Sequence, residues 1–321
     1  MKYTAIAPSN IAFIKYWGKK DEILRLPQNG SISMNLSNLL TKTTVEFNDK
    51  LTKDKVLFNG KEDNQVLLRV SGHLDRVREL AKKTTRAKVA IENNFPVATG
   101  LSASASVFAS LSLAATKSIG LSLSEKELSI LARQGSGSAC RSIPDGIVEW
   151  LDGDTSSTSY SVSLYPPSYW EIYDVVVVVS KNKKEVGSTE GQKLVDTSPF
   201  FQTRLLGMKK KIEECKQALK IKDFTRLGVL SEAEALEMHA VMLTSHPSLI
   251  YWTAESLTVM KFVKRLRTDG LEAYFTINTG QDVHILVEKK NLNKLTKKLK
   301  ELDVIRDIII NKPAKGAHLI V

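Results

Sequence analysis

The chain has 321 residues, of which 42% are apolar and 25% charged, and its formal charge is +11. This composition is typical of a globular protein, and a chain of this length buries enough apolar surface to fold without disulfide bonds. Its only cysteines, Cys140 and Cys215, form no CxxC pair, which argues against a disulfide framework and a structural zinc site. The start lacks a secretion leader, and no run reaches the roughly 18–20 apolar residues of a membrane span. We therefore expect a cytoplasmic protein with no membrane partner.

The first half of the chain predicts strands followed by helices. Apolar residues recur every three or four positions after Gln65, as in an amphipathic helix, and Ser124 with Glu127 has the pattern of a capping box. The predicted elements are strands and turns over 1–60, a helix over 65–82, a strand over 88–92, and helices over 102–116 and 124–133. The segment 134–142 that follows is predicted to be a loop, because it consists largely of glycine, serine and alanine.

The second half mixes strands and helices. Five consecutive valines, 175–179, suit a strand that is buried on both faces. The predicted elements are strands over 145–150, 159–164 and 175–179, helices over 199–219, 224–242 and 253–268, strands over 273–278 and 283–288, a helix over 291–303, and a last strand near 307–310. This order favours an α+β fold over a regularly alternating parallel sheet. The polar segment 181–198 is the best boundary candidate, which predicts domains over 1–183 and 184–321.

A glycine and several hydroxyls gather in Pro96–Ser106 (PVATGLSASAS), where a loop turns into a helix. Glycine lets the backbone approach a ligand, and the first N–H groups of a helix point outward unpaired. Such a helix start suits a phosphate group. The segment matches neither the Walker pattern nor GxGxxG, and a serine N-cap with tight helix packing explains it equally well.

Two further segments suit an anion. Ile14–Lys20 (IKYWGKK) follows a strand and could place lysine ammonium groups against phosphates, although a basic turn with half-buried aromatic side chains is the alternative. Arg133–Ser142 (RQGSGSACRS) contains two glycines, three serines and Arg141, whose guanidinium can bind a carboxylate or phosphate with two hydrogen bonds. Three such segments in one chain favour a phosphorylated ligand.

Four segments in this order, APSNIAFIKYWGKKDE, NNFPVATGLSASAS, RQGSGSACRS and GSTEGQ…TSP, resemble the diphosphomevalonate decarboxylases of the GHMP kinase superfamily. The resemblance covers almost the whole chain, and KYWGK and GSGSACRS are its most specific parts. It implies an N-terminal domain like ribosomal S5 domain 2, a ferredoxin-like α+β C-terminal domain, and an active site between them. It also implies that ATP and Mg²⁺ are used to phosphorylate the 3-hydroxyl of mevalonate 5-diphosphate. Phosphate and CO₂ then leave to give isopentenyl diphosphate for isoprenoid biosynthesis, and a homodimer is usual.

The resemblance assigns roles to individual residues. The matching substrate-binding positions are Tyr16, Trp17, Gly18, Lys19, Arg69, Ser136, Gly137, Ser138, Ala139, Cys140, Arg141, Ser188 and Thr189. The matching nucleotide-binding positions are Gly100, Leu101, Ser102, Ala103 and Ser104, with Ala103 in place of the first of two adjacent serines. Catalysis falls to Lys15 near the reacting hydroxyl, Arg141 at the substrate carboxylate, and Asn278. No metal ligand is assigned.

Asn278 departs from the family pattern. The family reads Asp-Ala-Gly-Pro-Asn after a strand where this chain has Asn278-Thr-Gly-Gln-Asp282, so the catalytic aspartate aligns with an asparagine. An amide does not accept a proton at neutral pH. The chemistry then depends on Lys15 or on Asp282, or the chain belongs to a divergent branch. Such branches include phosphomevalonate decarboxylases, which act on the monophosphate, and a 3-kinase that does not decarboxylate.

The remaining features are expected to be structural. Residues 181–321 carry a net charge of +8, from 25 basic and 17 acidic residues, but no aromatic-interleaved basic motif accompanies it. We therefore expect a small phosphorylated mevalonate as the partner and no nucleic acid. His239 lacks a second histidine at helical spacing, which argues against a metal site, and His284 alternates with apolar neighbours.

Overall fold

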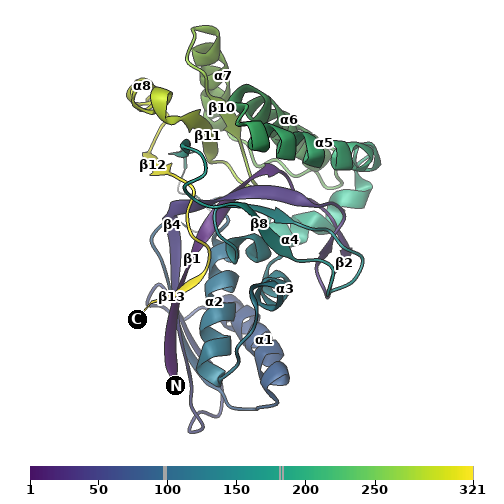
Figure 1. Ribbon diagram of the computed structural model, residues 1–321, viewed down its shortest axis with the longest axis vertical. Coiled ribbons are helices and arrows are strands. Elements are labelled where there is room, and N and C mark those ends of the chain that lie inside the picture. The colour runs from purple at the N-terminus through teal and green to yellow at the C-terminus, as the bar shows by residue number, and fades with distance from the viewer. Residues whose placement is uncertain (97–99, 181, 183, 321) are drawn as a thin grey trace.

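Two β-sheets with flanking helices make up the computed structural model, which describes residues 1–96, 100–180, 182 and 184–320 (Figure 1). The first sheet contains β13 (His318–Ile320), β1 (Lys2–Ile14), β4 (Ser31–Phe47), β6 (Ala87–Asn93) and β5 (Lys55–Phe58) in that order, with β7 (Ile147–Trp150) beside β4 and β8 (Ser161–Tyr165) beside β7. The second, wholly antiparallel sheet contains β10 (Tyr274–Thr276), β11 (Val283–Glu288), β9 (Ile172–Val178) and β12 (Asp307–Asn311). A small ribbon pairs β2 (Lys19–Asp21) with β3 (Leu26–Pro27).

Helices cover both sheets, and three of them lie along the first sheet while the long helices of the second half gather at the other end of the molecule (Figure 1). They are α1 (Asn64–Ala81), α2 (Ala103–Ile119), α3 (Glu125–Gly135), α4 (Ser188–Gly191), α5 (Phe201–Ile221), α6 (Phe224–Leu243), α7 (Ala254–Thr268) and α8 (Lys289–Leu299), with 3₁₀ helices η1 (Gly137–Ser142) and η2 (Gln192–Thr197). Within the described ranges, none of these helices has both the length and the apolar character needed to cross a bilayer.

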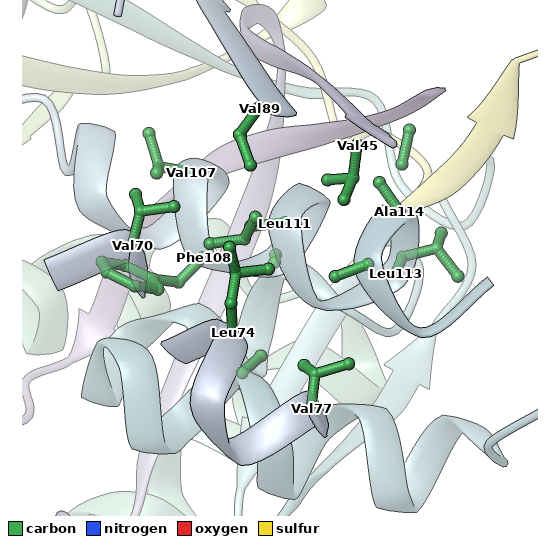
Figure 2. Packing of buried hydrophobic residues seen from close by; sticks show 14 of the residues in the cluster. Val45, Val70, Leu74, Val77, Val89, Val107, Phe108, Leu111, Leu113 and Ala114 are labelled. Atoms are coloured by element: carbon green, nitrogen blue, oxygen red, sulfur yellow. The ribbon is translucent and has the colours of Figure 1, made fainter. Parts of the chain in front are cut away.

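One hydrophobic core forms where α1 and α2 pack on the first sheet. Figure 2 shows Val70 and Leu74 of α1 close to Phe108 and Leu111 of α2, and Val77, farther along α1, belongs to the same buried cluster. Helix α2 is rich in alanine and serine and is buried along most of its length. These small side chains let the helix approach the sheet closely. This close approach fixes where the N-terminus of α2 lies.

Hydroxyl groups also hold α2 on the sheet. The Ser106 and Ser110 hydroxyls lie 2.6 and 2.7 Å from the Thr41 and Thr43 hydroxyls of β4. Pairing of this kind is needed because an unsatisfied buried hydroxyl costs about 1–3 kcal/mol.

Strand β1 is irregular where the functional residues lie. Its register against β4 shifts between Pro8 and Asn10 and again between Ala12 and Ile14. A bulge leaves one residue unpaired and changes the direction of nearby side chains, and bulges are frequent beside active sites. The shift lets the Ser9 hydroxyl donate to the Leu101 carbonyl at 2.6 Å, which ties β1 to the segment before α2.

Most sequence-predicted elements are confirmed. The capping box at Ser124 is present, and the valine strand β9 sends Val176 and Val178 into one buried cluster and Val175 and Val177 into another. The expected α+β class is confirmed as well.

Three details of the element prediction are wrong. The segment 134–142 contains the 3₁₀ helix η1, α8 begins and ends earlier than predicted, and the strand near 307–310 is followed by β13. Strand pairing also crosses the predicted boundary between residues 183 and 184 twice, because β9 joins the second sheet and β13 returns to the first. The division into domains over 1–183 and 184–321 stays a prediction.

Gly228 should be intolerant of a side chain. A Cβ there would lie 2.0 Å from the ring of Tyr274, because α6 packs directly on β10. We expect Gly228→Ala to lower the free energy of unfolding by about 1–3 kcal/mol, the usual cost of overpacking a core. Urea unfolding measures it.

Gly72 is the matched control, since it lies within α1 and a Cβ there would point into open space, with no contact inside 4 Å beyond the adjacent residues and backbone of its own helix. Gly72→Ala should raise stability by about 0.5–1 kcal/mol through helix propensity. Equal effects of the two substitutions would contradict the proposed packing.

Candidate active site

Lys15 lies directly after β1, where the two sheets meet. Its side chain is buried, with 1% of the residue exposed. The ammonium nitrogen Nζ donates to the Ala12 carbonyl at 2.7 Å and to Asn278 Oδ1 at 3.2 Å. The structure therefore brings together two of the residues predicted to be catalytic, although they are separated by more than 250 positions in the sequence.

Burial lowers the pKa of Lys15 to about 7. The charges around it act in both directions, because Glu234 and Asp174 raise this pKa while Arg141 and Arg204 lower it. A lysine with such a pKa is divided between ammonium and neutral amine near neutral pH. In its neutral form it can accept a proton.

Every polar edge of Asn278 is occupied. Its Oδ1 accepts from Lys15, while Nδ2 donates to the Ser102 hydroxyl at 3.0 Å and to the Asn10 carbonyl at 3.3 Å. Its own carbonyl lies 3.0 Å from His239 Nε2, and burial lowers the pKa of His239 to about 3. His239 is thus a neutral imidazole that holds the backbone of Asn278.

The predicted nucleotide segment meets the loop after β10. Gly100 has φ of +114°, and a Cβ there would lie 2.6 Å from the Cα of Gly280. Only glycine adopts this conformation at such close backbone contact without strain. Leu101 is buried and Ala103 begins α2, whereas residues 97–99 of the predicted segment lie outside the described residues.

Serine hydroxyls at the start of α2 face the site. Ser102 precedes the helix with φ of +55° and makes no side-chain cap, because its hydroxyl accepts from Asn278 instead. The Ser104 hydroxyl lies 3.1 Å from the Ser136 hydroxyl at the start of η1. The predicted nucleotide and substrate segments are therefore adjacent in space.

Arg141 of η1 is a buried cation held by neutral groups. It donates to the hydroxyls of Ser33 at 3.0 Å and Ser31 at 2.6 Å, and to Asn10 Oδ1 at 3.1 Å. Only 3% of the residue is exposed, and no carboxylate of the described ranges pairs with it. Burying an unpaired charge is costly, so this site favours an anionic ligand.

The rest of the 136–141 segment packs tightly beneath Arg141. A Cβ on Gly137 would lie 2.8 Å from the hydroxyl of Tyr16, whose ring meets Trp150 edge-on at 4.6 Å. The Ser138 carbonyl accepts from Asn10 at 3.2 Å. Ala139 is fully buried.

Cys140 has a packing role within this segment. Its Sγ donates to the Gly137 carbonyl at 3.0 Å, and burial raises the pKa of the thiol to about 11. A protonated, buried thiol is not a nucleophile.

The aromatic-basic segment after β1 divides between the site and the core. Trp17 is 1% exposed and packs in a buried cluster with Val195 and Met238. Gly18 has φ of +96° and turns the chain into the small ribbon, where Lys19 pairs with Glu22.

Three arginines form a basic cluster, defined as Arg25, Arg69 and Arg76. Arg25 Nε donates to the Gln134 carbonyl at 3.0 Å, and Arg69 lies 5.0 Å above the ring of Phe108. Desolvation and the charge of Arg25 lower the pKa of both Arg69 and Arg76. Within the described part of the chain, neither Arg25 nor Arg69 pairs with a carboxylate.

The start of α4 contacts the segment that follows Asn278. Ser188 begins α4 and its hydroxyl lies 2.5 Å from that of Thr279, the residue after Asn278, while Thr189 follows in the same turn. Lys184 donates to the Ser188 hydroxyl at 2.8 Å, and burial lowers the pKa of this lysine to about 8.

Comparison with known proteins identifies the family. Residues 7–161 match the diphosphomevalonate decarboxylase-like N-terminal domain, and residues 174–314 match the mevalonate 5-diphosphate decarboxylase C-terminal domain. The diphosphomevalonate decarboxylase of Candida albicans is 36% identical over 307 residues, covering 90% of this chain and 85% of that protein. The chain belongs to the diphosphomevalonate decarboxylase family. The human diphosphomevalonate decarboxylase is 35% identical over 88% of this chain and 76% of its own.

Solved structures of the family share the fold. Mevalonate diphosphate decarboxylase from Staphylococcus aureus has a TM-score of 0.94 at 41% identity and covers 100% of this chain and 98% of its own. A complex of MDDEF with MVAPP, AMPPCP and magnesium has a TM-score of 0.94 at 38% identity, over 100% of this chain and 99% of its own. The two-domain GHMP kinase fold expected from the sequence is thereby confirmed.

Several residues of this decarboxylase-family site were missed by the sequence analysis. Asn10, Ser31 and Ser33 hold Arg141, and Arg25 joins the basic cluster. The available signal was weak: polar residues at buried positions of otherwise apolar strands, and one arginine with φ of +51° in a turn.

The described residues offer no ready-made metal cage, since no group of three His, Cys, Asp or Glu side chains lies together in the described ranges. Asp282 is buried and accepts from the Val179 backbone N–H at 3.0 Å. Magnesium keeps several waters and often binds through substrate phosphates with few protein ligands. The site therefore fits an ion that arrives with a nucleotide.

Proposed function

We propose that the protein uses ATP and Mg²⁺ to decarboxylate mevalonate 5-diphosphate, giving isopentenyl diphosphate, ADP, phosphate and CO₂ in the mevalonate pathway. One observation carries the proposal. Asn278 hydrogen-bonds both Lys15 and Ser102, and Asn10 bonds both Asn278 and Arg141, so one network joins the three regions that such a reaction needs. Membership of the family over both domains supports the same reaction.

Each part of the substrate has a counterpart in this network. The carboxylate would be bound by Arg141, which has no anionic partner in the described residues and presents a planar guanidinium. The diphosphate would extend along Tyr16 and Ser138 toward the basic cluster. ATP would bind with its phosphates at Gly100–Ser104, where the free N–H groups at the start of α2 favour negative charge.

Lys15 would accept the proton of the substrate hydroxyl. Its neutral amine accepts the proton of the substrate 3-hydroxyl as that oxygen attacks the γ-phosphorus of ATP and ADP leaves. Asn278 cannot accept this proton, but it holds the amine through Oδ1. Magnesium, when bound with the nucleotide, neutralises charge on the transferred phosphoryl group.

Decarboxylation would follow from the 3-phosphate. The C3–O bond breaks with loss of phosphate, the C1–C2 bond breaks with loss of CO₂, and the electrons of the latter bond form the C2–C3 double bond. The carboxylate becomes neutral CO₂ in this step, because the electron pair of the C1–C2 bond moves into the new double bond and the C3–O electron pair leaves with the phosphate. Arg141 would therefore orient the carboxylate through the hydroxyl-held guanidinium, without protonating it.

Incubation with ATP, Mg²⁺ and mevalonate 5-diphosphate tests the proposal. We expect equal amounts of ADP, CO₂ and isopentenyl diphosphate. If the protein decarboxylates mevalonate 5-phosphate but not mevalonate 5-diphosphate, it is instead a phosphomevalonate decarboxylase. ADP with a stable 3-phosphate and no CO₂ would identify a 3-kinase.

We further propose that the protein is a cytoplasmic homodimer. Each chain would consist of two domains, over residues 1–183 and 184–321. Both Cys140 and Cys215 are free, which suits a reducing compartment. The homodimer rests on family resemblance, and sedimentation analysis would contradict it by giving the monomer mass.

The pH dependence of turnover tests the role of Lys15. In the parent protein, kcat/KM should rise with pH through an ionisation near 7, because the ammonium must lose its proton to become an acceptor. Asn278→Asp should remain active and move this rise to about 4 or below, since the new carboxylate would accept the proton and the ammonium would lower its pKa.

A lysine variant in the site and a matched variant outside it test the same role. Lys15→Met should reduce turnover by at least about 100-fold, the lower range for a general base. Lys300→Met, on the exposed end of α8, should leave turnover unchanged. An active Lys15→Met variant, or an Asn278→Asp profile like the parent's, would refute the assignment.

Arg25 should favour the diphosphate over the monophosphate. Arg25→Gln should raise the KM for mevalonate 5-diphosphate about tenfold, comparable to loss of a charged hydrogen bond, while acting less on the 5-phosphate. Arg306→Gln removes the same charge at an exposed position outside the basic cluster and should change neither KM. Equal effects of Arg25→Gln on both substrates would place Arg25 away from the terminal phosphate.

A further inference from the structure

A buried ion pair from the second half of the chain brackets the peptide units of Lys15. Glu234 Oε2 accepts from the Lys15 backbone N–H at 3.0 Å, and Arg204 Nη2 donates to the Lys15 carbonyl at 3.1 Å. The two side chains also pair with each other at 2.9 Å. Arg204 comes from α5 and Glu234 from α6, so helices more than 180 residues away in sequence hold the residue that follows β1.

The Arg204–Glu234 pair is buried and held by further hydrogen bonds. The side chains of Arg204 and Glu234 are 2% and 0% exposed. Asn29 completes the arrangement, because its Nδ2 donates to the Lys15 carbonyl at 2.9 Å while its Oδ1 accepts from Arg204 at 3.3 Å. Each backbone group of Lys15 therefore has a charged partner with little freedom to move.

Stability alone explains this arrangement poorly. A buried ion pair is often no more stabilising than well-packed apolar side chains of the same volume, because desolvation offsets the attraction. Here the pair meets the backbone of the one lysine whose ammonium contacts Asn278. That coincidence points to a role in placing Lys15.

We propose that Glu234 and Arg204 are positioning residues that fix the Lys15 backbone and set the charge state of its ammonium for proton transfer. The inference rests on the proposed function of Lys15. Glu234 would act through its negative charge as well as its hydrogen bond, and Lys211 would moderate that charge, because its Nζ lies 2.8 Å from Glu234 Oε1.

The charged and titratable groups around Lys15 come from four elements, α6, α5, η1 and β9, and β1 adds the neutral Ala12 carbonyl. The groups are Glu234 and His239 of α6, Arg204 of α5, Arg141 of η1 and Asp174 of β9. Among these, only Glu234 and Arg204 touch the Lys15 backbone. Among the neighbouring charges, that of Glu234 raises the pKa of the Lys15 ammonium the most.

Three variants test the proposal through the pH dependence of kcat/KM. Glu234→Gln keeps an oxygen for the Lys15 N–H but removes the charge, so the rising limb should move to lower pH by about one unit. Lys211→Met leaves the charge of Glu234 less compensated and should move the limb to higher pH. Glu237→Gln is the control, because Glu237 also pairs with Lys211 but is not among the charged groups that shift the pKa of Lys15, and the limb should stay in place.

A structural role alone would lower activity without moving the limb. If Glu234→Gln and Lys211→Met both retain the parental midpoint, the proposal is overturned. Should circular dichroism show that Glu234→Gln does not fold, the comparison of Lys211→Met with Glu237→Gln decides, since Lys211 is partly exposed.

A second readout separates this proposal from the proposed function. The Lys15 side chain can be titrated by NMR in the substrate-free parent and variants, without turnover. The same opposite shifts would support the positioning role even if the parent released no CO₂, and identical midpoints would overturn it whatever the parent catalyses.

Discussion

The structure depends on burying one lysine where two sheets meet. Removing Lys15 from water disfavours its ammonium, and its pKa falls to about 7 as a result. The surrounding elements must then satisfy the side chain without a direct carboxylate contact, which the Ala12 carbonyl and Asn278 do. The irregular register of β1 and the contact of Gly100 with Gly280 serve the same junction, because they bring the start of α2 against it.

Asparagine suits this junction in a way that aspartate would not. Its amide accepts from Lys15 on one side and donates to Ser102 and to the Asn10 carbonyl on the other. A carboxylate in the same place would set an oxygen against the Asn10 carbonyl. It would also raise the pKa of the lysine. In the proposed mechanism, asparagine at this position would leave proton acceptance to Lys15 while keeping the geometry of its ammonium.

The sequence predicted local features well. Helix periodicity gave α1 and α5–α7 within a few residues, and the valine run gave β9, because both patterns follow directly from which faces are buried. Strand β13 was missed, since its three residues carry no periodic signal and form a strand only by pairing with β1.

The candidate site was predictable only in part. Segments with glycine and hydroxyls were found because they have unusual local composition. Asn10, Arg204 and Glu234 were not, because each acts through a contact with a residue more than 100 positions away in the sequence. The sequence did not indicate that Trp17 is buried in a cluster with Val195 and Met238, because those partners lie far away along the chain.

The charge state of Lys15 decides whether this lysine can accept a proton, and a titration of its ammonium measures that state. Heteronuclear NMR of the substrate-free protein, with the Lys15 signal assigned by its loss in Lys15→Met, follows the ammonium as pH rises. We expect a midpoint near 7. A midpoint close to the ordinary lysine value of about 10.4 would contradict it, because Lys15 would then hold its proton at neutral pH and could not accept another.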